Sequence, residues 1–152
     1  MASWGNAALK IAEGNPDVEI VEERRQTPTA ARKQLERAQR ESLSRLFLAH
    51  WARWELPTLT PPGTGGKEHQ FHPERKWRFD FCLPEQMIAI EIHGGTWQNG
   101  RHNRAQGFAN DREKMNAAQA LGWTVFELTD VMLRDRDVMD KQLQAIKERI
   151  GQ

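Results

Sequence analysis

The segments Trp77-Arg-Phe-Asp-Phe81 and Met87-Ile-Ala-Ile-Glu-Ile-His93 decide the fold, because both follow the two-residue period of a β-strand. A short link that contains Pro84 joins them, so we expect an antiparallel hairpin. If Cys82 faces Met87, one side of this hairpin is wholly apolar and consists of Trp77, Phe79, Phe81, Ile88, Ile90 and Ile92. The other side consists of Arg78, Asp80, Cys82, Met87, Ala89, Glu91 and His93.

Two carboxylates lie close together on the mixed side. In this register Asp80 is opposite Ala89 and diagonal to Glu91, where like charges destabilise a sheet unless a cation lies between them. A divalent metal is the simplest such cation, and a metal held by strand carboxylates indicates phosphate chemistry. The alternative is an ordinary solvent face, in which Asp80 pairs with Arg78 or with a lysine of a neighbouring element.

Length and composition narrow the class of protein. A chain of 152 residues is long enough for one domain. The net charge of +1 does not by itself indicate a nucleic-acid partner, so basic groups would have to be concentrated locally. The single cysteine, Cys82, excludes a disulfide within the chain and a Cys-rich zinc site, and it favours a cytoplasmic setting. No membrane-length apolar run and no secretory signal are visible, so we expect no membrane partner.

The rest of the chain predicts a mixed α/β domain. Residues 1–27 are polar and net acidic, and we expect an arm that is disordered or pairs with a partner chain, ahead of a folded domain at 28–152. Thr27 and Pro28 predict the start of a long helix that Pro57 ends. Its apolar positions are Leu35, Ala38, Leu43, Leu46, Phe47, His50, Trp51 and Trp54, and its basic ones are Arg32, Lys33, Arg37, Arg40 and Arg45.

The elements around the hairpin follow from the same patterns. Residues 68–72 predict a first strand, which makes three antiparallel strands with the hairpin. A basic and aromatic loop is expected at 96–107, a helix at 108–121, a strand at 123–128 and a closing helix at 138–150. The predicted order is therefore helix, three antiparallel strands, helix, strand, helix.

The hairpin resembles the PD-(D/E)XK nuclease superfamily, whose motif is an acid on the second strand followed by Glu-x-Lys on the third. The matching residues are Asp80 and Glu91-Ile92-His93, and the element order agrees with a restriction-endonuclease-like core. Small phage and prophage nucleases are similar in more detail, with a Gly-Gly after the third strand, a Gly-Arg-His loop and a helix that contains Asp and Lys. This chain has Gly94-Gly95, Gly100-Arg-His102 and Asp111-Arg-Glu-Lys114, so the resemblance covers roughly residues 68–128.

The chain departs from this pattern at two positions. Phe79 stands where the motif's proline would be, and His93 stands where its lysine would be. The lysine is thought to orient or deprotonate the attacking water, so either His93 takes that role or a lysine has moved to the next helix, where Lys114 is the candidate. His93 is otherwise a metal ligand or a solvent-facing residue, and Lys114 is otherwise an exposed charge paired with Asp111 or Glu113.

The resemblance implies a magnesium-dependent DNA endonuclease, with Mn²⁺ as a substitute, that hydrolyses phosphodiester bonds with a metal-activated water. Asp80, Glu91 and the Ile92 carbonyl are expected to hold the metal, with Glu68, or else Glu41, as a further acid. We expect DNA contacts from Gln98, Arg101, His102 and Arg104 in the loop and from Arg78 in the hairpin.

Substrate form stays open at this point. Similar enzymes include Holliday-junction resolvases, nicking enzymes and repair endonucleases, which would place the chain in a bacterium or a phage-infected host, and a resolvase would have to be a homodimer on branched DNA. One alternative is a nuclease-like fold that binds DNA without cleaving it. Another is a histidine-based ββα-metal nuclease centred on His102-Asn103.

Overall fold

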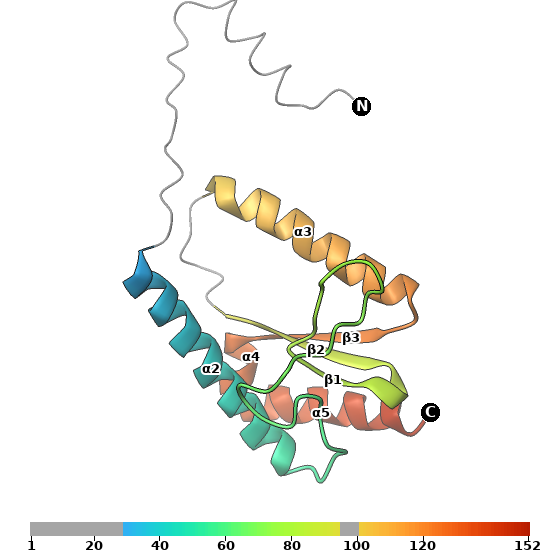
Figure 1. Cartoon of the computed structure of the whole chain (residues 1–152). Helices are drawn as coiled ribbons and strands as arrows, with labels where there is room; N and C mark the ends of the chain where they lie inside the picture. The colour runs from blue at the N-terminus through green and yellow to red at the C-terminus, as the bar shows by residue number, and fades with distance from the viewer. Residues whose placement is uncertain (1–28, 95–100) are drawn as a thin grey trace, which may run out of the picture.

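The computed structural model describes residues 29–94 and 101–152, and for residues 101–105 only the backbone is described. This part of the chain is mixed α/β, with four α-helices and a three-stranded sheet in the order β1-β2-β3 (Figure 1). The predicted arm at 1–27 and Gln98 lie outside the described residues.

The first described helix, α2 (Ala30–Ala52), begins slightly later than the sequence predicts. Thr29, not Thr27, is its N-cap, and the Thr29 side chain accepts a hydrogen bond from the Arg32 backbone N–H. Only the second half of the helix reaches the core, through Leu43, Phe47 and Trp51. The prediction that Leu35 belongs to the core is wrong, because residues 30–42 are all exposed and extend beyond the sheet (Figure 1).

The hairpin forms, but in a different register. Strand β1 (Phe81–Leu83) pairs antiparallel with β2 (Ile88–His93) through the 3₁₀ turn η1 (Pro84–Gln86). Cys82 pairs with Ala89 and not with Met87, because Met87 belongs to the turn, where it has a left-handed φ of 54°. The difference is two residues, so the strands keep their faces and Asp80 comes into line with Glu91.

The predicted strand at 68–72 is not a strand. Gln70 and Arg78 form an isolated antiparallel bridge, and the only other such bridge among the described residues joins Thr60 to Cys82. The chain bends at Asp80, between the bridge and β1, which ends regular pairing. The bend also changes the direction of Phe79, which packs with Cys82 and Ala89 and not with Phe81 as predicted.

After the hairpin the chain crosses to a parallel strand. Helix α3 (Arg101–Ala120) connects β2 to β3 (Thr124–Thr129), which pairs with β2 along its whole length. The predicted loop at 96–107 is thus wrong from Arg101 onward. Two further helices, α4 (Asp130–Arg134) and α5 (Arg136–Ile150), complete the chain, and α5 confirms the predicted closing helix.

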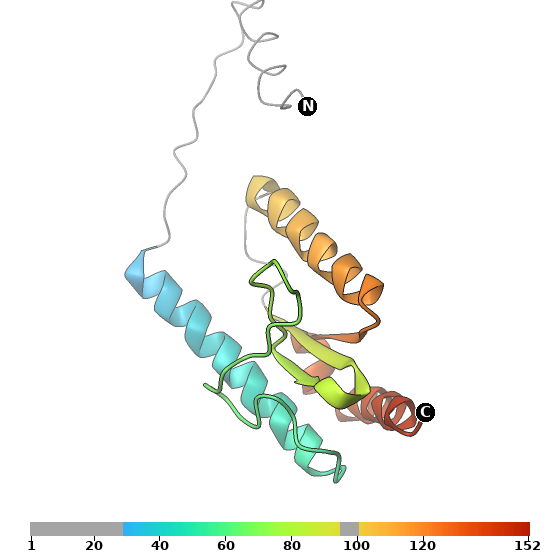
Figure 2. The ribbon, with the colours of Figure 1, turned by 45° about the vertical axis from the view of Figure 1, so that its right-hand side comes forward.

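Each face of the sheet is covered by helices (Figure 2). The larger core lies between the sheet and helices α2, α4 and α5, and it is centred on Phe47, Ile90 and Leu143. The smaller core lies on the α3 side, where Ala89 of β2 contacts Ala118 and Trp123. Helix α3 therefore lies over the face that carries the alternating residues Ala89, Glu91 and His93, which places it above the predicted carboxylates.

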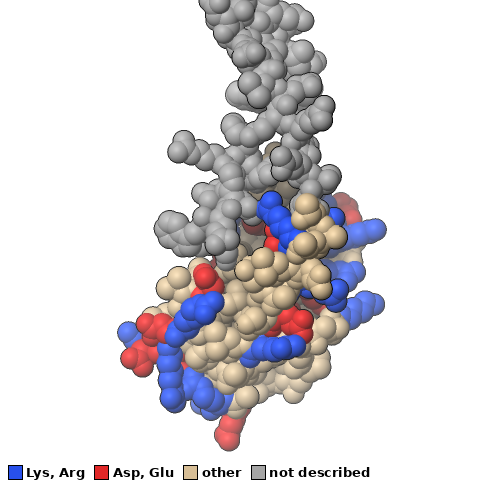
Figure 3. All heavy atoms as spheres, turned by 90° about the vertical axis from the view of Figure 1, so that its left-hand side faces the viewer, with Lys and Arg blue, Asp and Glu red and all other residues tan. Residues whose placement is uncertain are grey.

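The face of the protein shown in Figure 3 carries charges of both signs. No helix in the described part of the chain has the length and apolar character needed to cross a bilayer. On the face shown in Figure 3, Lys and Arg form several separate groups with Asp and Glu between them. The mixed distribution agrees with the small net charge, so any nucleic-acid contact has to be sought in particular side chains.

Candidate active site

Glu91 is the buried charged residue around which the candidate site is built. It lies in the middle of β2, and only 7% of it is exposed. Its Oε1 atom is 2.8 Å from the ammonium group of Lys114, which comes from α3. The Lys114 ammonium also lies 5.8 Å from the centre of the Phe79 ring. A carboxylate and an ammonium are therefore held together in a largely water-excluded place between the sheet and α3.

Asp80 lies beside this pair, directly ahead of β1. Its Oδ2 atom accepts a hydrogen bond of 2.8 Å from the Ile92 backbone N–H. Because the chain bends at Asp80, its own backbone does not continue the ladder there, and the carboxylate satisfies a donor of β2 instead. The hydrogen bond fixes Asp80 at the Glu91 position of β2, so the structure brings the two predicted acids together.

The electrostatics of Glu91 reflect this arrangement. Burial, and then the negative charge of Asp80, raise the pKa of Glu91 from 4.5 to about 7. Lys114 and a hydrogen bond from the Asp80 backbone act in the opposite direction, but they do not outweigh burial. A further cation near Glu91 and Asp80 would favour the ionised form of Glu91, and it would offset both the burial and the repulsion by Asp80.

The position of Lys114 decides between two sequence hypotheses. Its expected pairing with Asp111 or Glu113 is wrong, because Lys114 contacts Glu91 while Glu113 pairs with Arg75 at 3.0 Å. Lys114 follows the exposed Glu113 and precedes the buried Met115, and its own side chain is largely buried toward the sheet. The structure thus places a lysine at the acid pair from the helix that follows β2.

A second charged cluster, which the sequence analysis missed, adjoins the first. Glu127 of β3 is the register partner of Glu91 and faces α3 as well. Arg112 of α3 binds Glu127 with two hydrogen bonds of 3.2 and 2.8 Å, which lower the pKa of Glu127. His93 Nε2 lies 3.1 Å from Glu127 Oε2, and the His93 side chain is 29% exposed, so it is only partly open to solvent. The alternation Val125-Phe126-Glu127 was the available signal, because it predicts that Glu127 shares a face with Val125.

Asp80 and Glu91 suit a hard cation in their chemistry. Mg²⁺ is commonly bound by one or two carboxylates, with water and substrate phosphate as its other ligands. Among the residues whose side chains are described, no group of three His, Cys, Asp or Glu residues is placed to hold a metal ion. A two-carboxylate site remains, and the raised pKa of Glu91 fits it, because a bound cation would compensate the buried charge.

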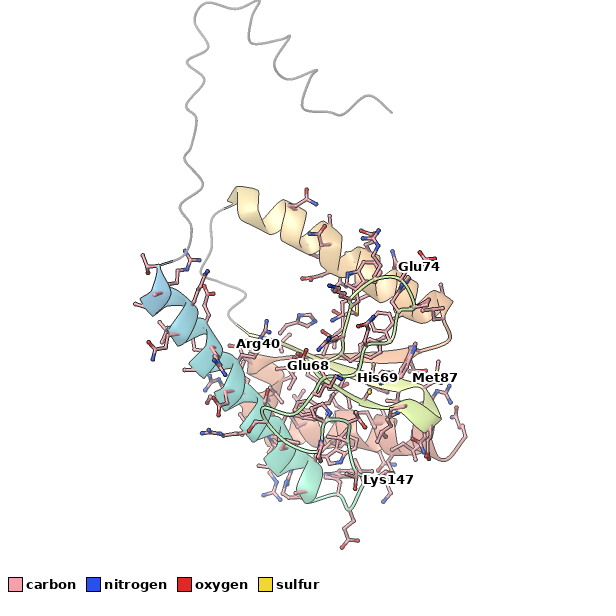
Figure 4. All side chains as sticks on the ribbon, viewed as in Figure 1. Arg40, Glu68, His69, Glu74, Met87 and Lys147 are labelled. Carbon is pink, nitrogen blue, oxygen red and sulfur yellow. The ribbon has the colours of Figure 1, made fainter. Side chains whose placement is uncertain are left out.

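Of the two further acids that the sequence suggests, Glu68 remains a prediction and Glu41 lies elsewhere. Glu68 is half-buried in the loop between α2 and β1, which crosses in front of the sheet in Figure 4. It does not join Asp80 and Glu91 in a recognisable three-residue group. Glu41 is exposed on α2 and forms an ion pair with Arg45, so the structure gives it no place beside the acid pair.

The predicted DNA-contacting residues are only partly described. Arg78 is exposed next to Asp80. The side chains of Arg101, His102 and Arg104 are outside the described part, but their backbone forms the first turn of α3. His102 therefore lies in a helix and not at a strand end, which contradicts the ββα-metal arrangement.

Comparison with known proteins finds no match to a family model, to a curated protein or to a solved structure.

Proposed function

We propose that the protein is a Mg²⁺-dependent DNA endonuclease that hydrolyses phosphodiester bonds. The observation that carries this proposal is the Glu91 carboxylate, buried next to Asp80 and 2.8 Å from Lys114. Acid, acid and lysine on one side of a sheet are the groups that the PD-(D/E)XK resemblance implies, with the lysine supplied from α3. The antiparallel hairpin followed by a helix and a parallel strand supports a restriction-endonuclease-like core.

Each of these side chains has a defined role in this proposal. Asp80 and Glu91 hold the cation, and Mn²⁺ is expected to replace Mg²⁺. The bound ion supplies Lewis-acid stabilisation of the phosphate charge and a lower pKa for water. The Lys114 ammonium donates hydrogen bonds next to Glu91, where it orients the attacking water and stabilises negative charge.

The test is a cleavage assay on linear duplex, single-stranded and four-way DNA with Mg²⁺, with Mn²⁺ and with chelator. We expect metal-dependent cleavage that Asp80→Asn and Glu91→Gln each reduce by at least about 10²-fold. Both replacements keep an oxygen acceptor for Ile92 N–H or Lys114, which favours retention of the fold. DNA binding should persist or strengthen, because a negative charge is removed.

Glu113→Gln is the matched control. Glu113 lies on α3 beside Lys114, carries the same charge and pairs on the surface with Arg75, so its replacement should leave cleavage unchanged. Full activity of either Asp80→Asn or Glu91→Gln would refute the assignment.

A nuclease-like fold that only binds DNA is the alternative. It predicts salt-sensitive binding that is independent of Mg²⁺, with no cleavage of any of the three substrates. Burial, and then repulsion by Asp80, raise the pKa of Glu91, and this costly pair of acids favours the enzyme, because a protein that only binds phosphates gains nothing from it.

The form of the DNA substrate is decided by the same assay. Preferential cleavage of the four-way junction would indicate a resolvase, which requires two active sites. Sedimentation that shows only monomer, with and without DNA, would exclude the homodimeric resolvase and leave a nicking or repair endonuclease.

A further inference from the structure

Among the described residues, none forms a core beneath the first half of α2. Residues 30–42 are all exposed, and Leu35, their largest apolar side chain, is 59% exposed. A helix that is polar on every side needs stabilisation from pairs of side chains along its surface. Two such i,i+4 ion pairs are present, Arg32–Glu36 and Glu41–Arg45. The two ion pairs occupy the acidic residues of this segment, Glu36 and Glu41.

Three cations of the same segment have no carboxylate partner in the described part of the chain. They are Lys33, Arg37 and Arg40, and each is exposed. Their spacing of four and then three residues puts them on one stripe of the helix, which rises by about 1.5 Å per residue. The stripe is therefore about 10 Å long, and no described carboxylate pairs with its charges.

The stripe leads to the end of the sheet where the candidate site lies. A Cβ atom added at Gly94, directly after β2, would be 2.6 Å from Leu43 Cδ1, so α2 touches the end of β2 one turn beyond Arg40. In Figure 4 Arg40 extends from α2 toward the loop that carries Glu68. The N-terminal ends of α2 and α3 both project past this end of the sheet, one from each layer (Figures 1 and 2).

We propose that Lys33, Arg37 and Arg40 bind the phosphate backbone of duplex DNA beside the acid pair. The inference rests on the proposed function for its substrate, and it adds a surface that holds the duplex outside the site. Unpaired cations in a row match a row of phosphates, and contacts of this kind position DNA without reading its sequence. A second copy of this chain fits the stripe less well, because like charges would face each other and Leu35 offers little apolar area for a stable dimer.

The experiment measures DNA binding apart from cleavage. Fluorescence anisotropy of a labelled duplex is recorded in chelator, with full-length protein, between about 50 and 200 mM salt. Arg37→Gln combined with Arg40→Gln should reduce the magnitude of the negative slope of log K against log salt by about 1.8, or about 0.9 for each phosphate contact. Adding Lys33→Gln should lower it by about 0.9 more. Circular dichroism should stay unchanged, because these side chains are exposed and glutamine is a good helix former.

Lys141→Gln combined with Lys147→Gln is the matched control. Both residues are exposed on α5, and Lys147 lies far from Arg40 in Figure 4. This variant removes the same charge and should keep the slope of the unaltered protein. An equal decrease in both double variants, or none in the α2 variant, would overturn the inference.

Other outcomes separate the inference from the proposed function. If the α2 variant has the lower slope but the unaltered protein never cleaves DNA, the binding surface stands and the nuclease proposal fails. If cleavage depends on Glu91 but the slope is insensitive to Arg37 and Arg40, the nuclease stands and the stripe is not its DNA contact. A change in sedimentation without a change in slope would assign the stripe to a dimer and would overturn the inference.

Discussion

Lys114 Nζ and Glu91 Oε1 lie 2.8 Å apart, although 23 residues separate them in the sequence. The Lys114 side chain is 17% exposed and that of Glu91 is 9% exposed, so both charges are largely removed from water. Such a pair is costly to bury, and it is strongly destabilising to lose one partner. This relationship links the stability of the fold to the chemistry proposed for it.

Cleavage should depend on Lys114 more than on His93. We expect Lys114→Ala to reduce the cleavage rate by about 10²-fold or more, because its ammonium is the group in contact with Glu91. His93→Ala should cost less than about tenfold, because His93 approaches Glu127 instead. The rates are compared at saturating Mg²⁺, with Lys141→Ala as a control for loss of charge. A larger loss in His93→Ala would assign the water-orienting role to the histidine.

Lys114→Met should destabilise the protein in a pH-dependent way. At pH 8 the Glu91 carboxylate is ionised and would lose its partner, at a cost of about 2 to 3 kcal/mol. At pH 5, below the raised pKa of about 7, Glu91 is mostly protonated and the cost should be much smaller. Urea unfolding at both pH values, in chelator, measures the difference. An equal cost at both would show that the pKa of Glu91 is not raised.

Glu91→Gln should flatten the dependence of stability on pH. The folded-state pKa of Glu91 is raised from 4.5 to about 7, so its contribution is fully present below pH 4.5 and is lost as pH rises toward 7. The unaltered protein should therefore lose on the order of 2 kcal/mol between pH 5 and 8 from this group. Glu91→Gln removes this loss, which thermal or urea unfolding in chelator will detect. Steeper pH dependence in the variant would contradict the sign.

Two leucines of α2 should respond differently to the same substitution. Leu43 is 7% exposed in the core, so Leu43→Ala should cost about 2 to 4 kcal/mol in free energy of unfolding. Leu35 is 59% exposed, so Leu35→Ala should change stability by less than about 0.5 kcal/mol. Similar costs at both positions would show that residues 30–42 pack against something in solution.

Cys82 should be inert in the folded protein. Burial raises the pKa of its thiol to about 12, which leaves almost no thiolate near neutral pH. Mass spectrometry after treatment with iodoacetamide should show no modification until denaturant is added. Rapid modification without denaturant would mean that β1 opens readily.

The local patterns of the sequence predicted most of the elements. Helical spacing identified α5, a β-rich run identified β3, and alternation identified which residues of β2 face each core. The errors occur where pairing with distant residues decides the outcome. Residues 68–72 have the composition of a strand, but the bend at Asp80 limits them to one bridge.

The same division applies to the candidate site. Glu91 and its proximity to Asp80 were predictable, because a shift of two residues in the register leaves the side chains of β1 and β2 on their own faces. Lys114 was a candidate only through the family resemblance, and the contact of Arg112 with Glu127 was not predicted, because the rotation of α3 above the sheet depends on packing such as that of Ala118 and Trp123.

By itself the sequence determined the hairpin, the two faces of β2 and the pair of acids, since these follow from the period of a strand. Only the tertiary structure decided that Lys114 meets Glu91, that Glu127 lies next to it and that the first half of α2 is exposed. The physical reason is that contacts between elements depend on packing across the whole core, which no local pattern of residues encodes.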